Sequence, residues 1–290
     1  MKKLILLITC IFSALPLMAQ TPQEPEVYEL WPNGAPTESG ITEEEKEIFP
    51  TFTAYIKKAT LTVYKPQRPN GTCIICCPGG GYFGLSLLNE GSSMATWLNN
   101  QGVTFVLLKY RMPNGHKQIP LEDGEQAIRM VRAHAAEWGV NPNKVGIMGS
   151  SAGGHFAATL STLYTSKETR PDFSILFYPV ISMETGITHQ GSRENLLGKN
   201  PTTEEVSHYD LDKQVTADTP PAFLVLAADD ETVNPLNSIS YYQQLLAHQV
   251  KNSVMFIYPY GGHGFGFQDS FKFKREWTGE LETWLRDIIF

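Results

Sequence analysis

The sequence predicts an α/β fold with a mostly parallel central sheet and helices on both of its faces. Short runs of β-branched and apolar residues alternate with longer segments of helical periodicity, which is the pattern of βαβ units. Most of the short runs are apolar throughout, as expected of strands covered on both faces. The chain of 290 residues, 42% hydrophobic and 18% charged, has the composition and length of one globular α/β domain.

The alternation can be followed element by element. The expected strands are Ala59–Tyr64, Cys73–Cys77, Val103–Tyr110, Lys144–Met148, Phe173–Val180, Ala222–Ala227 and Ser253–Tyr258. The expected helices are Ser93–Asn100, Gly124–Trp138, Ala152–Tyr164, Ser238–His248 and Arg275–Ile289. In the second helix Ile128, Val131 and Ala135 recur at helical spacing, and Gly139 provides a stop.

The first twenty residues predict a signal peptide. Lys2 and Lys3 precede an apolar run that ends at Leu17, and Ala19-Gln20 provides a small residue at a cleavage point. A retained membrane anchor is the weaker interpretation, because the run is too short to span a bilayer comfortably. We therefore expect residues 21–290 to form a single secreted or periplasmic domain without membrane contact after cleavage.

The charge of the chain excludes some classes of partner. The formal net charge is −7, and no cluster of lysine or arginine stands out. Binding to nucleic acid or to an anionic membrane surface would need such a cluster. We therefore expect neither partner.

Three cysteines lie close together in one predicted strand. Cys73 and Cys76 have the spacing of a metal or redox pair, with Cys77 beside them. Successive side chains of a strand point to opposite faces, so Cys73 and Cys76 cannot share a ligand there. We interpret the three as small buried residues and expect neither a metal nor an organic cofactor.

The strongest local motif is Gly149-Ser150-Ser151-Ala152-Gly153. It fits Gly-x-Ser-x-Gly in one frame only, with Ser151 as the central serine. A strand is expected before it and a helix after it, so Ser151 lies on a sharp strand-to-helix turn that exposes its hydroxyl. The backbone N–H groups at the start of that helix can stabilise a developing oxyanion. The motif predicts a nucleophilic serine.

A serine nucleophile needs a base, usually histidine, and an acid that orients this base. When the serine lies on a strand-to-helix turn of this kind, the acid follows it in the chain and the histidine comes last. Asp229 and Asp230 follow the strand Ala222–Ala227, and His263 lies in a glycine-rich loop after the last expected strand. We favour Asp230 as the acid, and Asp229 would then cap or brace the turn. Asp229 stays an alternative.

Donors for the oxyanion are expected from the loop Pro78-Gly79-Gly80-Gly81-Tyr82. It directly follows the strand Cys73–Cys77, and a run of glycines lets backbone N–H groups point into a small site.

These segments resemble the esterases of the α/β-hydrolase superfamily, in particular bacterial acetyl xylan esterases and hormone-sensitive-lipase-like enzymes. The resemblance covers nearly the whole mature chain. Its motifs are Leu30–Pro36, Pro78–Tyr82, Val103–Arg111, Met148–His155, Arg170–Phe173, Tyr178–Ile181, Ala227–Val233 and Gly262–Gly266. It implies a triad of Ser151, Asp230 and His263, and oxyanion N–H groups from Gly80, Gly81 and Ala152.

The predicted reaction is ester hydrolysis through an acyl-enzyme. The resemblance implies short-chain esters, acetyl esters in particular, on a plant polysaccharide such as xylan. Aromatic residues beside the motifs, Tyr82 and Phe265, are candidates for binding substrate, and the polar segment 182–221 is expected to be an insertion near the active site. The alternatives are a general carboxylesterase, a peptidase or amidase, and a carbohydrate-binding protein on an inactive hydrolase fold.

Overall fold

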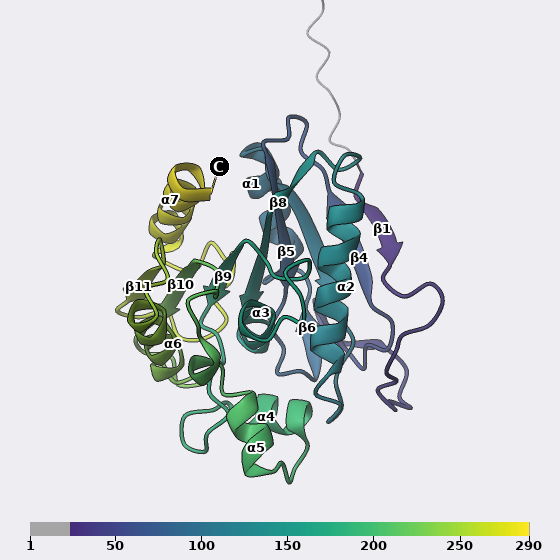
Figure 1. Cartoon of the computed structure of the whole chain (residues 1–290), viewed down its shortest axis with the longest axis vertical. Coiled ribbons are helices and arrows are strands. Elements are labelled where there is room, and N and C mark those ends of the chain that lie inside the picture. Colours follow the sequence, from purple (N-terminus) through teal and green to yellow (C-terminus); the bar gives the residue numbers. More distant parts are fainter. Residues whose placement is uncertain (1–23, 290) are drawn as a thin grey trace, which may run out of the picture.

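The computed structural model describes residues 24–289, so the expected signal peptide, residues 1–20, lies outside the described part. In that part, eight strands form one sheet in the order β1-β4-β7-β5-β8-β9-β10-β11 (Figure 1). These strands are β1 (Glu26–Glu29), β4 (Thr60–Tyr64), β5 (Gly71–Cys77), β7 (Thr104–Lys109), β8 (Val140–Ser150), β9 (Phe173–Phe177), β10 (Ala222–Ala227) and β11 (Val254–Tyr258). β1, β4 and β7 pair antiparallel, and the strands from β7 to β11 pair in parallel. The predicted α/β fold with a mostly parallel sheet is confirmed.

Helices cover both faces of this sheet. They are α1 (Ala95–Asn100), α2 (Ile119–Ala133), α3 (Ala152–Thr162), α4 (Gln190–Leu197), α5 (Thr203–His208), α6 (Leu236–Ala247) and α7 (Lys274–Trp284). Short turns precede or follow them at η1 (Ser92–Met94), η2 (Leu211–Gln214) and η3 (Leu285–Ile289). α2, α3 and α6 contribute to the core on one face, and α1 and α7 contribute to the core on the other. None of the helices between residues 24 and 289 has the length and apolar character that a membrane span requires.

The central strand β5 separates the two cores. Cys73 belongs to the core on one face and Cys76 to the core on the other, as the alternation of a strand requires. Both residues and Cys77 are buried free thiols, and burial raises the pKa of each thiol. The interpretation of these cysteines as small buried residues is confirmed.

The N-terminal third contains strands that the sequence pattern did not predict. β1 pairs with β4 at the edge of the main sheet, and a separate small sheet has the order β2-β3-β6. Its strands are β2 (Lys46–Phe49), β3 (Phe52–Ala54) and β6 (Gly84–Ser86). Each of these strands has at most four residues, and β2 is exposed along its length, so none has the apolar run that marks a buried strand.

Helix α2 begins at Ile119, before the predicted start at Gly124, and ends at Ala133. Pro120 lies in its first turn, where a proline without an N–H is tolerated. Gly124 marks a close helix contact instead of a helix start, because a Cβ there would lie 2.4 Å from a side-chain carbon of Leu160 on α3. The predicted boundary was wrong because the glycine serves packing, which has no local signal.

Segment 182–221 contains α4, α5 and η2 (Figure 1). α5 begins with a capping box, in which the Thr202 hydroxyl accepts from the Glu205 N–H and the Glu205 carboxylate accepts from the Thr202 N–H. α4 reaches back to the glycine loop, since Asn195 Nδ2 donates to the Gly81 carbonyl at 2.8 Å.

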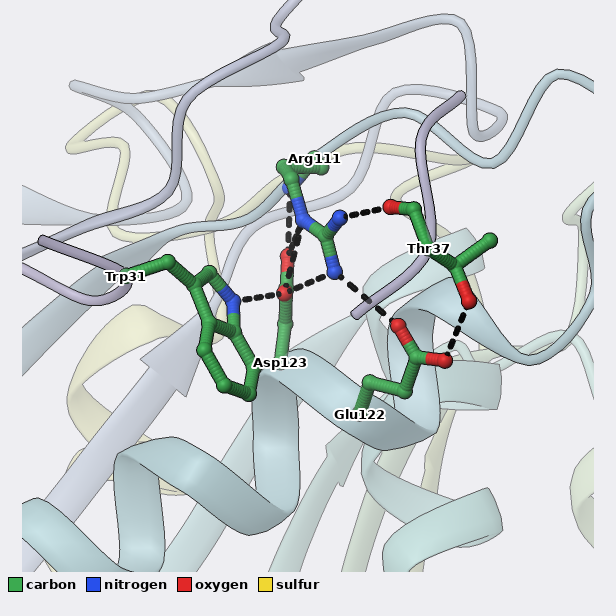
Figure 2. A network of polar contacts seen from close by, with 5 residues as sticks. All are labelled: Trp31, Thr37, Arg111, Glu122 and Asp123. Atoms are coloured by element: carbon green, nitrogen blue, oxygen red, sulfur yellow. Dashed lines mark hydrogen bonds and ion pairs between the residues drawn. The ribbon is translucent and has the colours of Figure 1, made fainter. Parts of the chain in front are cut away.

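A buried ion pair fixes the N-terminal segment to α2 (Figure 2). The Arg111 guanidinium donates to both carboxylate oxygens of Asp123, and the Trp31 indole donates to the same carboxylate at 2.7 Å. The guanidinium also donates to the Thr37 carbonyl and to Glu122. Both partners of the central pair are nearly inaccessible to water, with side-chain exposure of 3% for Arg111 and 0% for Asp123.

Removing one partner of this pair is expected to destabilise the protein strongly. The substitution Asp123→Ala should lower the free energy of unfolding by roughly 3–5 kcal/mol, because it leaves the buried guanidinium with only the more distant and more exposed Glu122 as a counter-charge. Urea denaturation followed by circular dichroism measures this change. Glu122→Ala, which removes the more exposed partner, should cost only about 1 kcal/mol or less. Equal losses in the two variants would contradict this account of the network.

Candidate active site

The turn between β8 and α3 presents Ser151. Its backbone has φ 54° and ψ −120°, a strained conformation for a residue with a side chain. Two flanking glycines make the turn possible. A Cβ on Gly149 would lie 1.9 Å from the Gly153 carbonyl oxygen, and one on Gly153 would lie 2.0 Å from the Cys77 carbonyl oxygen. The adjacent Ser150 ends β8 and is 1% exposed.

Three side chains from separate elements form one row of hydrogen bonds. His263 Nε2 lies 2.8 Å from Ser151 Oγ, and His263 Nδ1 lies 2.7 Å from Asp230 Oδ2. A carboxylate can only accept, so Nδ1 carries the ring proton and Nε2 accepts from the serine hydroxyl. This tautomer lets His263 remove the proton from Ser151.

Asp230 is held in place by its own backbone turn. Its Oδ1 accepts from the N–H groups of Thr232 and Val233, both at 2.9 Å, and its side chain is 1% exposed. Asp229 points elsewhere and accepts from the Gly262 N–H at 2.8 Å. Of the two acids considered from the sequence, the structure therefore brings Asp230 to His263, and Asp229 braces the histidine loop.

The glycine loop after β5 lies against the nucleophile. A Cβ on Gly79 would lie 2.9 Å from the Ser151 Cβ, so the loop backbone can approach only because no side chain is present. Gly80 and Gly81 have φ of 143° and 65°. The N–H groups of Gly80 and Gly81 take part in no hydrogen bond among the described residues. They are available to a ligand, together with the N–H of Ala152 at the start of α3.

The structure buries both aromatic residues that were expected to bind substrate, which corrects the expectation for Tyr82. Tyr82 is 1% exposed, its ring packs against Tyr110, and its hydroxyl lies 3.0 Å from His155 Nδ1. With φ 58°, the backbone of Tyr82 turns the side chain into the core. Phe265 is 4% exposed and stacks on Phe271 at 4.0 Å between ring centroids. The Tyr82 ring therefore has no face free for a sugar, whereas Phe265, although nearly buried, lines the hollow beside His263.

Two residues near the row, His189 and Glu90, are not among the site residues predicted from the sequence. Half-buried His189 begins α4, and its Nδ1 accepts from the Ser192 N–H, which leaves the proton on Nε2. Burial lowers the pKa of His189, as does the positive charge of nearby His263. Glu90 is buried and accepts from the Gly79 N–H at 3.0 Å. These residues come from segments without a recognisable motif, so their roles depend on tertiary contacts.

Two hollows in the described part of the chain differ in their position relative to the row of Ser151, His263 and Asp230. One of about 250 Å³ adjoins His263 and is also lined by Tyr260 and Lys272. A larger one of about 670 Å³ is lined by Trp31, Arg111 and neighbouring residues, and none of the three hydrogen-bonded side chains contributes to it. Size alone therefore does not locate the chemistry in this molecule.

Comparison with known proteins identifies the family. Residues 61–245, more than half of the chain, match the BD-FAE family. The chain is a member of the BD-FAE family. This BD-FAE member is 42% identical over 235 residues to an acetylxylan esterase of Xylanibacter ruminicola, covering 80% of the chain and 48% of the relative. It is 34% identical over 223 residues to endo-1,4-beta-xylanase B of Butyrivibrio fibrisolvens, covering 71% and 34%. The chain thus spans half or less of the length of these curated relatives.

Solved structures extend the comparison to the whole fold. The BD-FAE member is similar to an acetyl ester-xyloside bifunctional hydrolase from Caldicellulosiruptor lactoaceticus, with a TM-score of 0.77 and 32% identity over 91% of this chain and 97% of that one. It is also similar to a carboxylesterase from Lactobacillus plantarum, with a TM-score of 0.67 and 26% identity over 84% and 96%. These matches confirm the predicted resemblance to esterases of the α/β-hydrolase fold.

Proposed function

We propose that this BD-FAE member is a serine esterase that hydrolyses short acyl esters, acetyl esters above all, on a plant polysaccharide such as xylan. The observation that carries the proposal is the row Ser151–His263–Asp230, with its distances of 2.8 and 2.7 Å and a histidine tautomer fixed for accepting the serine proton. A serine hydroxyl beside a general base that a buried acid orients is the arrangement of acyl-transfer enzymes.

In the first half of the proposed reaction, Ser151 Oγ attacks the ester carbonyl and His263 Nε2 takes its proton. The carbonyl oxygen becomes an oxyanion, which the N–H groups of Gly80, Gly81 and Ala152 would stabilise. As the intermediate collapses, His263 gives the proton to the leaving alcohol. The acyl group then remains on Ser151 as an ester.

In the second half, His263 removes a proton from water, and the hydroxide formed attacks the acyl-enzyme. The acid leaves and Ser151 recovers its proton. Asp230 keeps the Nδ1 proton in place throughout and stabilises the imidazolium that forms twice in each cycle. Its two backbone hydrogen bonds prevent the carboxylate from rotating away.

The acyl group and the polymer are proposed from the relatives. One is named an acetylxylan esterase, another a xylanase, and a structural neighbour an acetyl ester-xyloside hydrolase. A xylan chain is too large to enter a cell, so the proposal includes export by the expected signal peptide at residues 1–20.

A chain-length series tests the proposed acyl specificity. Aryl esters from acetate to octanoate share one leaving group, so kcat/KM compares the acyl pocket alone. We expect a maximum at acetate and a fall of at least about 100-fold by octanoate, equivalent to about 2.7 kcal/mol. A closed acyl pocket gives this fall, whereas in an open apolar pocket each methylene that fits would favour the longer ester. α4 is tied to the Gly81 carbonyl through Asn195, so this helix lies beside the loop whose N–H groups would hold the carbonyl oxygen of the ester.

The controls separate the alternatives. Deacetylation of acetylated xylan is measured beside the aryl series, and an aryl amide is included. A maximum at butyrate or beyond would indicate a general carboxylesterase, and faster cleavage of the amide would indicate an amidase. No turnover of any ester by the folded protein would indicate a carbohydrate-binding role on an inactive fold.

A further inference from the structure

A buried carboxylate that takes no part in the proposed reaction, Glu90, lies between the glycine loop and Tyr178. Glu90 is 5% exposed and follows β6, 88 residues before Tyr178 in the chain. Its Oε2 accepts from the N–H of Gly79, the first glycine of the loop that faces Ser151, at 3.0 Å. Its Oε1 accepts from the Tyr178 hydroxyl at 2.7 Å.

The hydrogen-bond partners of Glu90 favour its ionised form. The Tyr178 oxygen accepts from the Gly266 N–H at 2.9 Å, so the tyrosine's own proton is directed to Glu90. The other carboxylate oxygen faces the Gly79 N–H. Both carboxylate oxygens of Glu90 therefore face a donor, as those of an ionised carboxylate do.

Tyr178 carries this connection to the histidine. Its ring packs edge-on against His263 at 4.8 Å between centroids, and the Phe265 ring supports its other side at 4.6 Å. Tyr178 has φ 35°, a strained value for an aromatic residue, and its N–H donates to the Val225 carbonyl at 2.8 Å. The structure thus maintains an unfavourable backbone conformation that places this ring between Glu90 and His263.

We propose that Glu90 is a positioning residue, which aligns the glycine loop with the histidine loop and places a second negative charge behind the His263 ring. The proposal rests on the proposed esterase function and deepens it. Gly79 belongs to the glycine loop and Gly266 to the loop that carries His263. These two loops must keep a fixed relative position so that the oxyanion donors and the base can act on the same substrate. One carboxylate, directly and through one tyrosine, bonds to both.

The charge also has an electrostatic consequence. Burial raises the pKa of Glu90, and the Tyr178 hydrogen bond, the positive charge of His263 and the Gly79 N–H oppose that rise. The interaction is mutual, so the Glu90 carboxylate stabilises the imidazolium. The other groups that face Glu90 are Cys76 and Tyr110, and those that face His263 are Asp230, His189 and Ser151. Neutralising Glu90 should therefore remove a charge that stabilises the imidazolium formed during the proposed reaction.

The test compares Glu90→Gln with a matched control, Glu125→Gln. Glu125 is also 5% exposed, but its carboxylate accepts from Thr165 and Thr169, away from the site. For Glu90→Gln we expect kcat for an aryl acetate to fall roughly 10²-fold with little change in KM, because the glycine loop loses its register. In the pH profile of kcat/KM, the midpoint of the acidic limb should shift to lower pH by about half a pH unit. For Glu125→Gln, the acidic limb of this profile should lie at the same pH as in the wild-type protein.

The outcomes are distinct. An acid limb for Glu90→Gln at the wild-type position, with kcat reduced no more than in Glu125→Gln, would overturn the proposal. If Glu90→Gln does not fold, Tyr178→Phe decides, since it keeps the ring and removes the hydroxyl bridge; a lower kcat supports the proposal and a wild-type kcat overturns it. Lack of activity in the wild-type protein would instead contradict the esterase function itself.

Discussion

Replacing Ser151 by alanine should reduce kcat for an aryl acetate by about 10⁴-fold or more, the typical cost of losing a nucleophile from such a row of residues. The variant keeps the turn and the fold, because alanine tolerates the space that serine fills. Only the hydroxyl that lies 2.8 Å from His263 Nε2 is lost. Steady-state kinetics on a folded sample, with melting temperature as a check, measures the effect.

Ser150→Ala is the matched control for this variant. Ser150 is the preceding residue, but it is the last residue of β8 and its side chain is buried. We expect it to keep most of the activity. Equal losses in both variants, with folding intact, would show that the frame of the Gly-x-Ser-x-Gly motif has been misassigned.

Asp230→Asn should have an effect of similar size, on the order of 10⁴-fold in kcat. In the wild-type protein Oδ1 accepts two backbone N–H groups, from Thr232 and Val233. An asparagine would keep its oxygen there and turn its NH₂ group toward His263 Nδ1. That nitrogen would then have to accept, so the ring proton would move to Nε2, where it blocks proton transfer from Ser151.

Asp229→Asn is the control for the acid. Its side-chain oxygen can still accept from the Gly262 N–H, so the brace of the histidine loop survives. We expect less than about a tenfold change in kcat, since the charge and tautomer of His263 are untouched. A large loss in this variant alone, in a folded protein, would reverse the assignment of the two acids.

The elements that carry the site could be predicted because their signals are local. β8, β10 and α3 are marked by continuous apolar or helical patterns, and Ser151 and His263 lie in glycine-rich segments next to them. Parallel strands bring their carboxyl ends to one edge of a sheet, so correct strands led directly to a correct meeting point for Ser151, Asp230 and His263.

Other parts have no local signal. Tyr82 follows the glycine loop in sequence, yet its positive φ directs the ring away from the site, and adjacency in the chain does not reveal side-chain direction. Glu90 lies in a loop whose polar partners are distant in sequence, so its role appears only after the chain has folded. The short strands of the small sheet have too few residues to show a period.

The order in which the site residues occur along the chain also bears on synthesis. The glycine loop, Ser151, Asp230 and His263 follow strands β5, β8, β10 and β11, and β11 is the edge strand of the sheet. As the ribosome extends the chain, the nucleophile emerges long before its base, and parallel pairings of this kind form slowly because they join distant segments. A nascent chain that stops before β11 carries Ser151 without His263, the proposed base. On the proposed mechanism, hydrolytic activity can therefore appear only after β11 has joined the sheet and brought His263 to Ser151.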